Sequence, residues 1–128
     1  MDTILYRLSQ PLAAASPFVA VMLVYATALL IEFFVASGSA KAFLMMPILL
    51  PLGDLIGVTR QTTVLAYCFG DGFSNLAYPT NPVLLICLGL TVASYAQWMR
   101  WTAKLWLWLF LATAAFLGLA VAVHFGPF

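Results

Sequence analysis

From residue 37 the sequence reads Ser37-Gly38-Ser39-Ala40-Lys41-Ala42, and further along it reads Gly70-Asp71-Gly72-Phe73-Ser74-Asn75. Both stretches are small, polar and helix-breaking, yet both are embedded in strongly apolar sequence. Non-helical polar backbone is tolerated at membrane depth only where it is buried in protein or lines a cavity. Two interruptions of this kind are the best sequence sign of a transporter's binding site. The pair therefore indicates part of a membrane carrier.

The composition supports a membrane location. Hydrophobic residues make up 65% of the chain and charged residues 7%, whereas soluble domains carry about 25% charged residues. Residues 105–123 contain no charge, and as a helix they would be about 28 Å long, enough to cross the hydrocarbon core. This apolar composition predicts lipid as a partner. The formal net charge is +1 and no basic stripe is present, so we expect no nucleic acid as a partner.

The chain is expected to fold as one all-α integral membrane domain over residues 1–128. Residues 1–16 read as an interfacial arm with an amphipathic pattern. Residues 17–53 read as a helical hairpin whose tip lies at 37–41. Its second arm, about 12 apolar residues with Pro47 and Pro51, is too short to span, so the hairpin is expected to be re-entrant.

The rest of the domain is expected to contain one broken and one straight transmembrane helix. The broken helix covers residues 60–96 and is unwound at 70–82, where Pro79 and Pro82 bracket polar residues. The straight helix covers 103–125. Residues 97–104 read as an interfacial loop, in which Arg100 and Lys104 lie among tryptophans, and the positive charges predict a cytoplasmic position for it.

Helix ends at the hairpin tip and at the unwound span predict the chemistry of a site. Freed carbonyls suit Na+, and helix N-termini suit a carboxylate. The expected substrate-binding residues are Ser37, Gly38, Ser39, Lys41, Ser74, Asn75, Thr80 and Asn81. The expected ion-coupling residues are Ser39, Gly70, Asp71, Gly72 and Asn75. Asp71 is the candidate Na+ ligand or proton acceptor, because a carboxylate at bilayer depth costs at least about 2.5 kcal/mol and is usually functional or paired. No cofactor is expected, other than Na+ as a coupling ion.

Several alternatives stay open from the residues alone. The 37–39 stretch could be an ordinary turn between membrane helices, and Asp71 could lie in a loop outside the membrane. Lys41 could pair with Asp71 or Glu32, or contact a substrate carboxylate. Glu32 is as well explained as a packing partner of Lys41 as by a role in transport. Enzyme chemistry has little support, because the one histidine, His124, is far from the serines and no phosphate-binding loop is present.

Five ordered blocks resemble a known family, the YfcC/DcuC-type anaerobic C4-dicarboxylate carriers of the ion transporter superfamily. The blocks read FFVASGSAKA at 33–42, MPIL at 46–49, DLIGVTRQ at 54–61, FGDGFSN at 69–75 and PT at 79–80. They cover nearly the whole chain and resemble the C-terminal repeat. Two positions depart from the family pattern, Glu32 where an amide is usual and Ala40 where glycine is usual.

The resemblance implies half of an inverted-repeat fold, with a midplane site and an elevator-type movement. It implies a multi-pass protein of the bacterial inner membrane that moves a carboxylate-bearing solute, such as a dicarboxylate or an amino acid, coupled to Na+ or H+. One repeat lacks half of the ligands, so we expect a separately encoded first repeat or a second copy of this chain as the partner. The alternative is a small non-transporting membrane subunit, or a truncated remnant of such a carrier.

Overall fold

The computed structural model describes residues 16–126, and these form five α-helices and no strand. The expected interfacial arm lies outside the described residues, apart from Ser16. The helices are α2 (Pro17–Phe34), α3 (Gly38–Ile56), α4 (Arg60–Ser74), α5 (Pro82–Gly89) and α6 (Tyr95–Ala122). Among the described helices, α2, α3 and α6 are long and apolar enough to cross a membrane. The all-helical membrane class is therefore confirmed.

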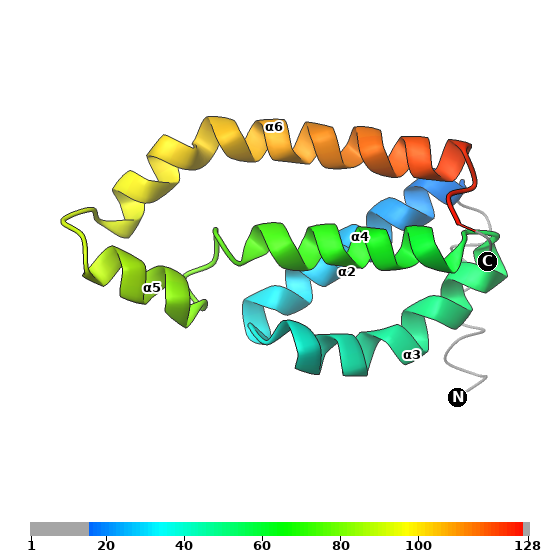
Figure 1. Ribbon diagram of the computed structural model, residues 1–128, viewed down its shortest axis with the longest axis horizontal. Coiled ribbons are helices and arrows are strands. Elements are labelled where there is room, and N and C mark those ends of the chain that lie inside the picture. The colour runs from blue at the N-terminus through cyan, green and yellow to red at the C-terminus, as the bar shows by residue number, and fades with distance from the viewer. Residues whose placement is uncertain (1–15, 127–128) are drawn as a thin grey trace.

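The helices begin where short polar side chains cap them. Ser16 accepts a hydrogen bond from the backbone of Val19 and precedes Pro17, the first residue of α2. Thr59 caps α4 in the same way. Each such cap satisfies a backbone N–H that has no partner inside the helix. The three-residue linker 35–37 between α2 and α3 leaves room only for a tight reversal, so these two helices form an antiparallel hairpin (Figure 1).

The predicted loop at 97–104 is wrong, because these residues belong to α6. Ser94 and Gln97 form a capping box, in which each side chain bonds to the backbone of the other residue. This motif starts a helix strongly, and no glycine or proline follows it before residue 118. The helix therefore runs through the Trp-rich segment without interruption. At 28 residues it is about 42 Å long.

The predicted start of the unwound segment at Gly70 is also wrong. Helix α4 continues through Gly70, Asp71 and Gly72 to Ser74, and the irregular connection follows it, up to Asn81. The two glycines disfavour helix by about 1 kcal/mol each, but the packing of α4 against α2 overrides this preference. Similarly, α3 begins at Gly38, directly after the turn, and not beyond Lys41. At 19 residues it is long enough to cross a membrane, so the prediction that this arm is too short to span is wrong.

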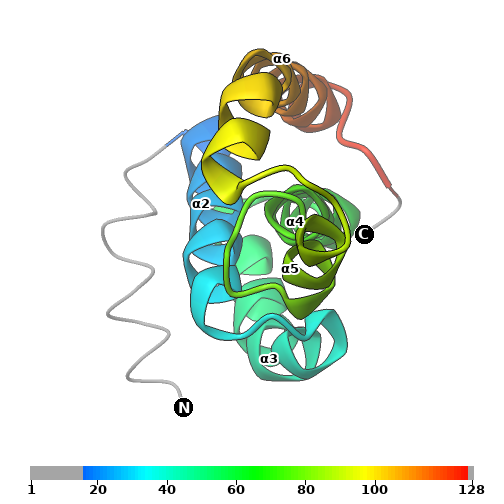
Figure 2. The same cartoon turned by 90° about the vertical axis from the view of Figure 1, so that its left-hand side faces the viewer.

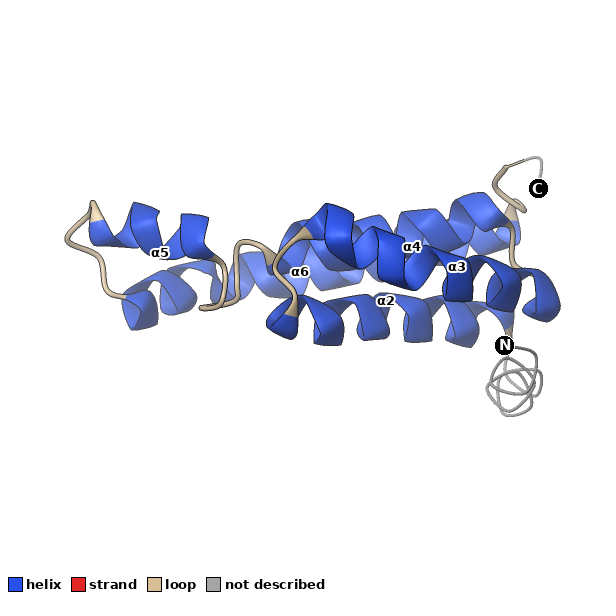
Figure 3. Cartoon of the chain, turned by 90° about the horizontal axis from the view of Figure 1, so that it is seen from below, coloured by secondary structure: helices blue, strands red, loops and turns tan. Residues whose placement is uncertain are grey.

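Helices α4 and α5 lie end to end on either side of the irregular connection. Helix α5 continues in the direction of α4 beyond the irregular connection, and α6 runs back along both of them (Figure 1). The end-on view agrees, since α5 overlaps α4 there (Figure 2). The hairpin of α2 and α3 lies along α4 and ends near the connection between α4 and α5 (Figure 3). The tip of the hairpin thus lies near the connection between α4 and α5.

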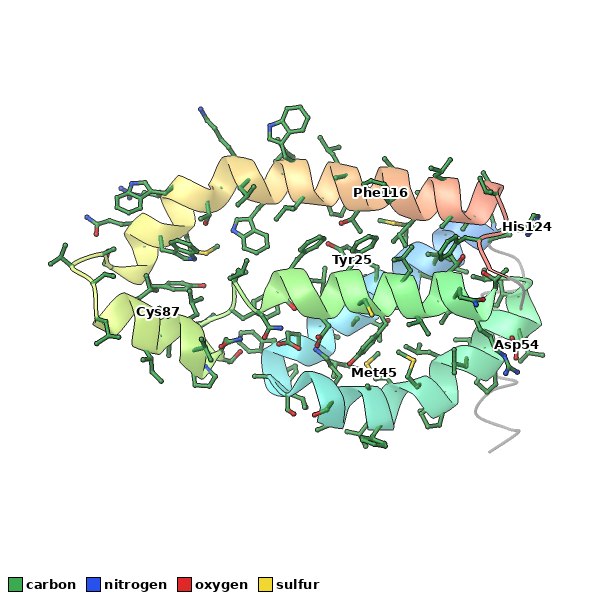
Figure 4. All side chains as sticks on the ribbon, in the orientation of Figure 1. Tyr25, Met45, Asp54, Cys87, Phe116 and His124 are labelled. Carbon is green, nitrogen blue, oxygen red and sulfur yellow. The ribbon has the colours of Figure 1, made fainter. Side chains whose placement is uncertain are left out.

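The core forms where α2 and α4 pack closely through small residues. Ala28 and Ala66 are fully buried, and a Cβ atom added to Gly70 would lie 2.6 Å from the Cβ of Ala28. Such close approach through small side chains is typical of helix packing in membranes. Tyr25 lies between α4 and α6, and Met45 extends the core toward α3 (Figure 4). This packing fixes the position of α4 against the hairpin.

Candidate functional site

Three charged side chains from three helices meet at the hairpin tip. Lys41 of α3 forms ion pairs with Glu32 of α2 and with Asp71 of α4, and its Nζ lies 2.6 Å from the Asp71 Oδ1. The side chains of Lys41 and Glu32 are 0% and 1% exposed, and that of Asp71 is 23% exposed. We call these three residues the charged triad.

The charged triad has a formal net charge of −1, since one ammonium group is shared by two carboxylates. Removing charges from water is costly, and the cost is repaid only where partners are close and well placed. Ionisable residues within membrane segments are rare and mark functional sites by default. The triad is therefore the strongest candidate for a functional site among the described residues.

The N-terminus of α3 faces the same carboxylate. A Cβ atom added to Gly38 would lie 2.9 Å from the Asp71 Oδ2, so a larger residue here would displace the carboxylate. Ser37, the residue before the helix, makes no side-chain capping bond. The first N–H groups of a helix carry a partial positive charge and favour an anion nearby. Asp71 thus receives the Lys41 ammonium on one oxygen and the start of α3 near the other.

Tyr67 also contacts the hairpin tip. Its hydroxyl donates a 2.8 Å hydrogen bond to the backbone carbonyl of Gly38, and its ring centroid lies 5.8 Å from the Lys41 Nζ. At this separation an aromatic ring attracts an ammonium group through its quadrupole. Tyr67 was not predicted from the sequence. Its spacing from Asp71 and Ser74 places the three on one helical face, but this signal requires that α4 continue past Gly70.

Polar side chains at the end of α4 stabilise the connection to α5. The Ser74 hydroxyl donates to the carbonyl of Gly70 at 2.6 Å, and the Asn75 amide donates to that of Asp71 at 2.9 Å. The Asn81 amide donates to the Asn75 side-chain oxygen at 2.6 Å, while its own oxygen caps α5. These predicted ligands therefore already have hydrogen-bond partners within the chain.

The structure brings only part of the predicted set together. Gly38, Lys41 and Asp71 converge, and Ser74, Asn75 and Asn81 form the adjacent hydrogen-bonded chain with Gly70. Four predicted residues are exposed around this region, namely Ser37, Ser39, Gly72 and Thr80. Glu32, for which the sequence left a packing role and a transport role open, proves to be part of the charged triad.

Two further features bear on ligand binding. In the described part of the chain, no group of three or more His, Cys, Asp or Glu side chains could hold a metal ion. A groove of about 620 Å³ lies along α3, and its lining includes Ser39, Phe43, Met46 and Arg60. Its mainly apolar lining contains no member of the charged triad. The groove therefore reaches the hairpin tip at Ser39 without including the charged triad.

Apolar helices around a buried cluster of charges are typical of membrane transport proteins, and this is the class that the fold and the site define. The family profile DcuC, described as the C4-dicarboxylate anaerobic carrier, matches residues 1–122. The chain belongs to this family, as its sequence motifs predicted.

Over 105 residues the chain is 42% identical to the "Putative basic amino acid antiporter YfcC" of Escherichia coli strain K12. The match covers 82% of this chain and 21% of the relative, so the chain spans about one fifth of that relative's length. No solved structure matches it significantly.

Proposed function

We propose that this chain is a C-terminal part of a secondary active transporter for a carboxylate-bearing solute, coupled to Na+ or H+. The observation that carries the proposal is the charged triad at the hairpin tip, beside the end of α4. Transporter sites of this kind lie where discontinuous helices bring their ends to one depth. A hairpin that enters and leaves by the same side of the membrane would give this arrangement.

A carboxylate has a suitable binding partner in the N-terminus of α3. The first turn there presents backbone N–H groups beside the exposed side chains of Ser37 and Ser39, and helix N-termini bind anions. Lys41 is the less suitable partner, because its ammonium group is enclosed by Glu32 and Asp71. The solute carboxylate is therefore assigned to the exposed residues Ser37 and Ser39 at the start of α3, since Gly38 between them already faces Asp71.

The family and the relative together support the substrate class that we propose. The description of the family names C4-dicarboxylates, and the name of the relative refers to basic amino acids. Both kinds of molecule carry a carboxylate. A dicarboxylate or an amino acid is thus the substrate we propose. Thr80, an exposed residue of the connection between α4 and α5, would contact the substrate.

The chain spans about one fifth of that relative's length, so it supplies only part of a carrier's ligands. We propose as the second component a separately encoded first repeat or a second copy of this chain, assembled in the bacterial inner membrane. The N-terminal end of α6, with Arg100 and Lys104, would face the cytoplasm. Native mass determination after gentle extraction from the membrane would identify this component.

The test is solute uptake by cells or vesicles that contain the assembled protein. Asp71→Asn should abolish coupled uptake of dicarboxylates and amino acids while the amount of protein in the membrane stays unchanged. Asp54→Asn is the matched control, because Asp54 pairs with Arg60 at the exposed opposite end of α3. Full uptake by Asp71→Asn would refute the site. A wild-type chain that is monomeric and carries nothing would instead support the alternative, a non-transporting subunit or remnant.

A further inference from the structure

The cation position beside Asp71 is already filled by the chain itself. Lys41 is fully buried, and its ammonium group lies between the carboxylates of Glu32 and Asp71. A lysine ammonium donates three hydrogen bonds and accepts none, so two carboxylates are a natural environment for it. Any other cation that bound both carboxylates would have to take the place of Nζ.

We infer that Lys41 is a built-in substitute for a metal cation, so that the charged triad binds no Na+. Sodium is coordinated by oxygen atoms, and the oxygens that converge here converge on Nζ. The Asp71 Oδ2 remains, but it faces the start of α3, where Gly38 leaves little room. The donor set around Asp71 therefore does not fit the Na+ that the sequence suggested.

Lys41 determines the net charge of the charged triad. With Lys41 present the triad has a net charge of −1, and without it the buried Glu32 and the partly exposed Asp71 would together carry −2. The position vacated by Nζ would then be lined by carboxylate oxygens and would attract a monovalent cation strongly. Removal of Lys41 should thus convert a site that does not bind Na+ into one that does.

The test compares thermal unfolding of the purified full-length chain in detergent, in NaCl and in N-methyl-D-glucamine chloride at equal ionic strength. The midpoint of wild-type unfolding should be the same in both salts. For Lys41→Gln, Na+ at ten times its dissociation constant should raise the midpoint by about 5 °C. Lys104→Gln removes the charge of an exposed lysine on α6 and is the matched control. It should behave as the wild type.

A second variant covers the case in which Lys41→Gln does not fold. The double variant Glu32→Gln with Lys41→Gln keeps the wild-type net charge of −1 but leaves Asp71 without its ammonium partner. Na+ should stabilise this variant as well, by a smaller shift. Stabilisation of the wild type by Na+ would overturn the inference, and so would the lack of any Na+ effect in the Lys41 variants that fold.

The inference rests on the proposed function for its meaning in transport, but its test does not. Unfolding midpoints are measured without solute and without movement across a membrane. A chain that transports nothing could still show the switch in Na+ dependence, which would leave the inference standing and the proposed function refuted. A chain that transports its solute, but whose wild type is stabilised by Na+, would refute the inference and leave the proposed function standing.

Discussion

The Tyr67 hydroxyl donates a hydrogen bond to the Gly38 carbonyl at 2.8 Å and so joins the middle of α4 to the first turn of α3. Tyr67 is one helical turn from Asp71, which contacts the same hairpin tip through Lys41. The hairpin tip is thus attached to α4 by a neutral hydrogen bond and by an ion pair. The two attachments can be removed separately.

Tyr67→Phe removes the hydrogen bond and keeps the ring near Lys41. We expect the free energy of unfolding in detergent to fall by about 1 kcal/mol, the usual net value of such a bond. Proteolysis at the hairpin tip should become faster, because the first turn of α3 loses its contact with α4. Tyr95→Phe, which removes a hydroxyl bonded to the Ala77 carbonyl away from the tip, is the control. Equal proteolysis of the tip in the two variants would contradict this role.

Gly70 and Gly72 differ sharply in their surroundings, although only one residue separates them in one helix. A Cβ atom at Gly70 would lie 2.6 Å from the Ala28 Cβ and 3.0 Å from the Tyr25 carbonyl, whereas one at Gly72 would meet nothing within 4 Å. Gly70→Ala should force α4 away from α2 and destabilise the chain by about 1–3 kcal/mol.

Gly72→Ala is the paired control for this prediction. Alanine favours helix over glycine by up to about 1 kcal/mol at an unhindered position, so this variant should be as stable as the wild type or more so. Thermal unfolding followed by circular dichroism measures both variants. If Gly72→Ala were the more damaging change, α4 would not continue through this segment as a helix.

The sequence predicted the class of fold because composition and long apolar runs determine it. It also indicated the two regions that meet at the hairpin tip, since their polar residues stand out from apolar surroundings. It misplaced the end of α4, because glycine propensity at Gly70 is a local signal and the contact with Ala28 is not. Local rules could not show that packing against α2 keeps this segment helical.

The charged triad was only partly predictable for a related reason. Glu32, Lys41 and Asp71 are visible in the sequence as rare charges, but their pairing depends on how three helices pack. The role of Tyr67 was hidden, because an aromatic residue in an apolar helix has no polar pattern that marks it. Its partner is a backbone carbonyl, and a backbone group leaves no trace in the sequence.

Asn81 connects the end of α4 to the start of α5. Its side-chain oxygen accepts hydrogen bonds from the backbone of Val83 and Leu84, and its amide donates to Asn75. Asn81→Ala should cost about 1–2 kcal/mol of stability, because a capping bond and a buried partner are lost together. Thr80→Ala alters the exposed neighbouring residue and should cost less than about 0.5 kcal/mol. Similar losses in both variants, measured by chemical unfolding, would show that the cap does not hold α5.

The charged triad predicts an asymmetry between its own members. Lys41→Met leaves the buried Glu32 and the partly exposed Asp71 without their shared cation. Removal of one partner from a buried ion pair costs about 3–5 kcal/mol. Glu32→Gln instead leaves Lys41 paired with Asp71 in a neutral cluster, so its cost should be clearly smaller. Arg60→Met breaks the exposed pair with Asp54 and should cost at most about 1 kcal/mol. Unfolding free energies in detergent give the three values. A cost for Glu32→Gln as large as that for Lys41→Met would mean that Glu32 is the principal partner of Lys41, and a net charge of −1 would then not describe the site.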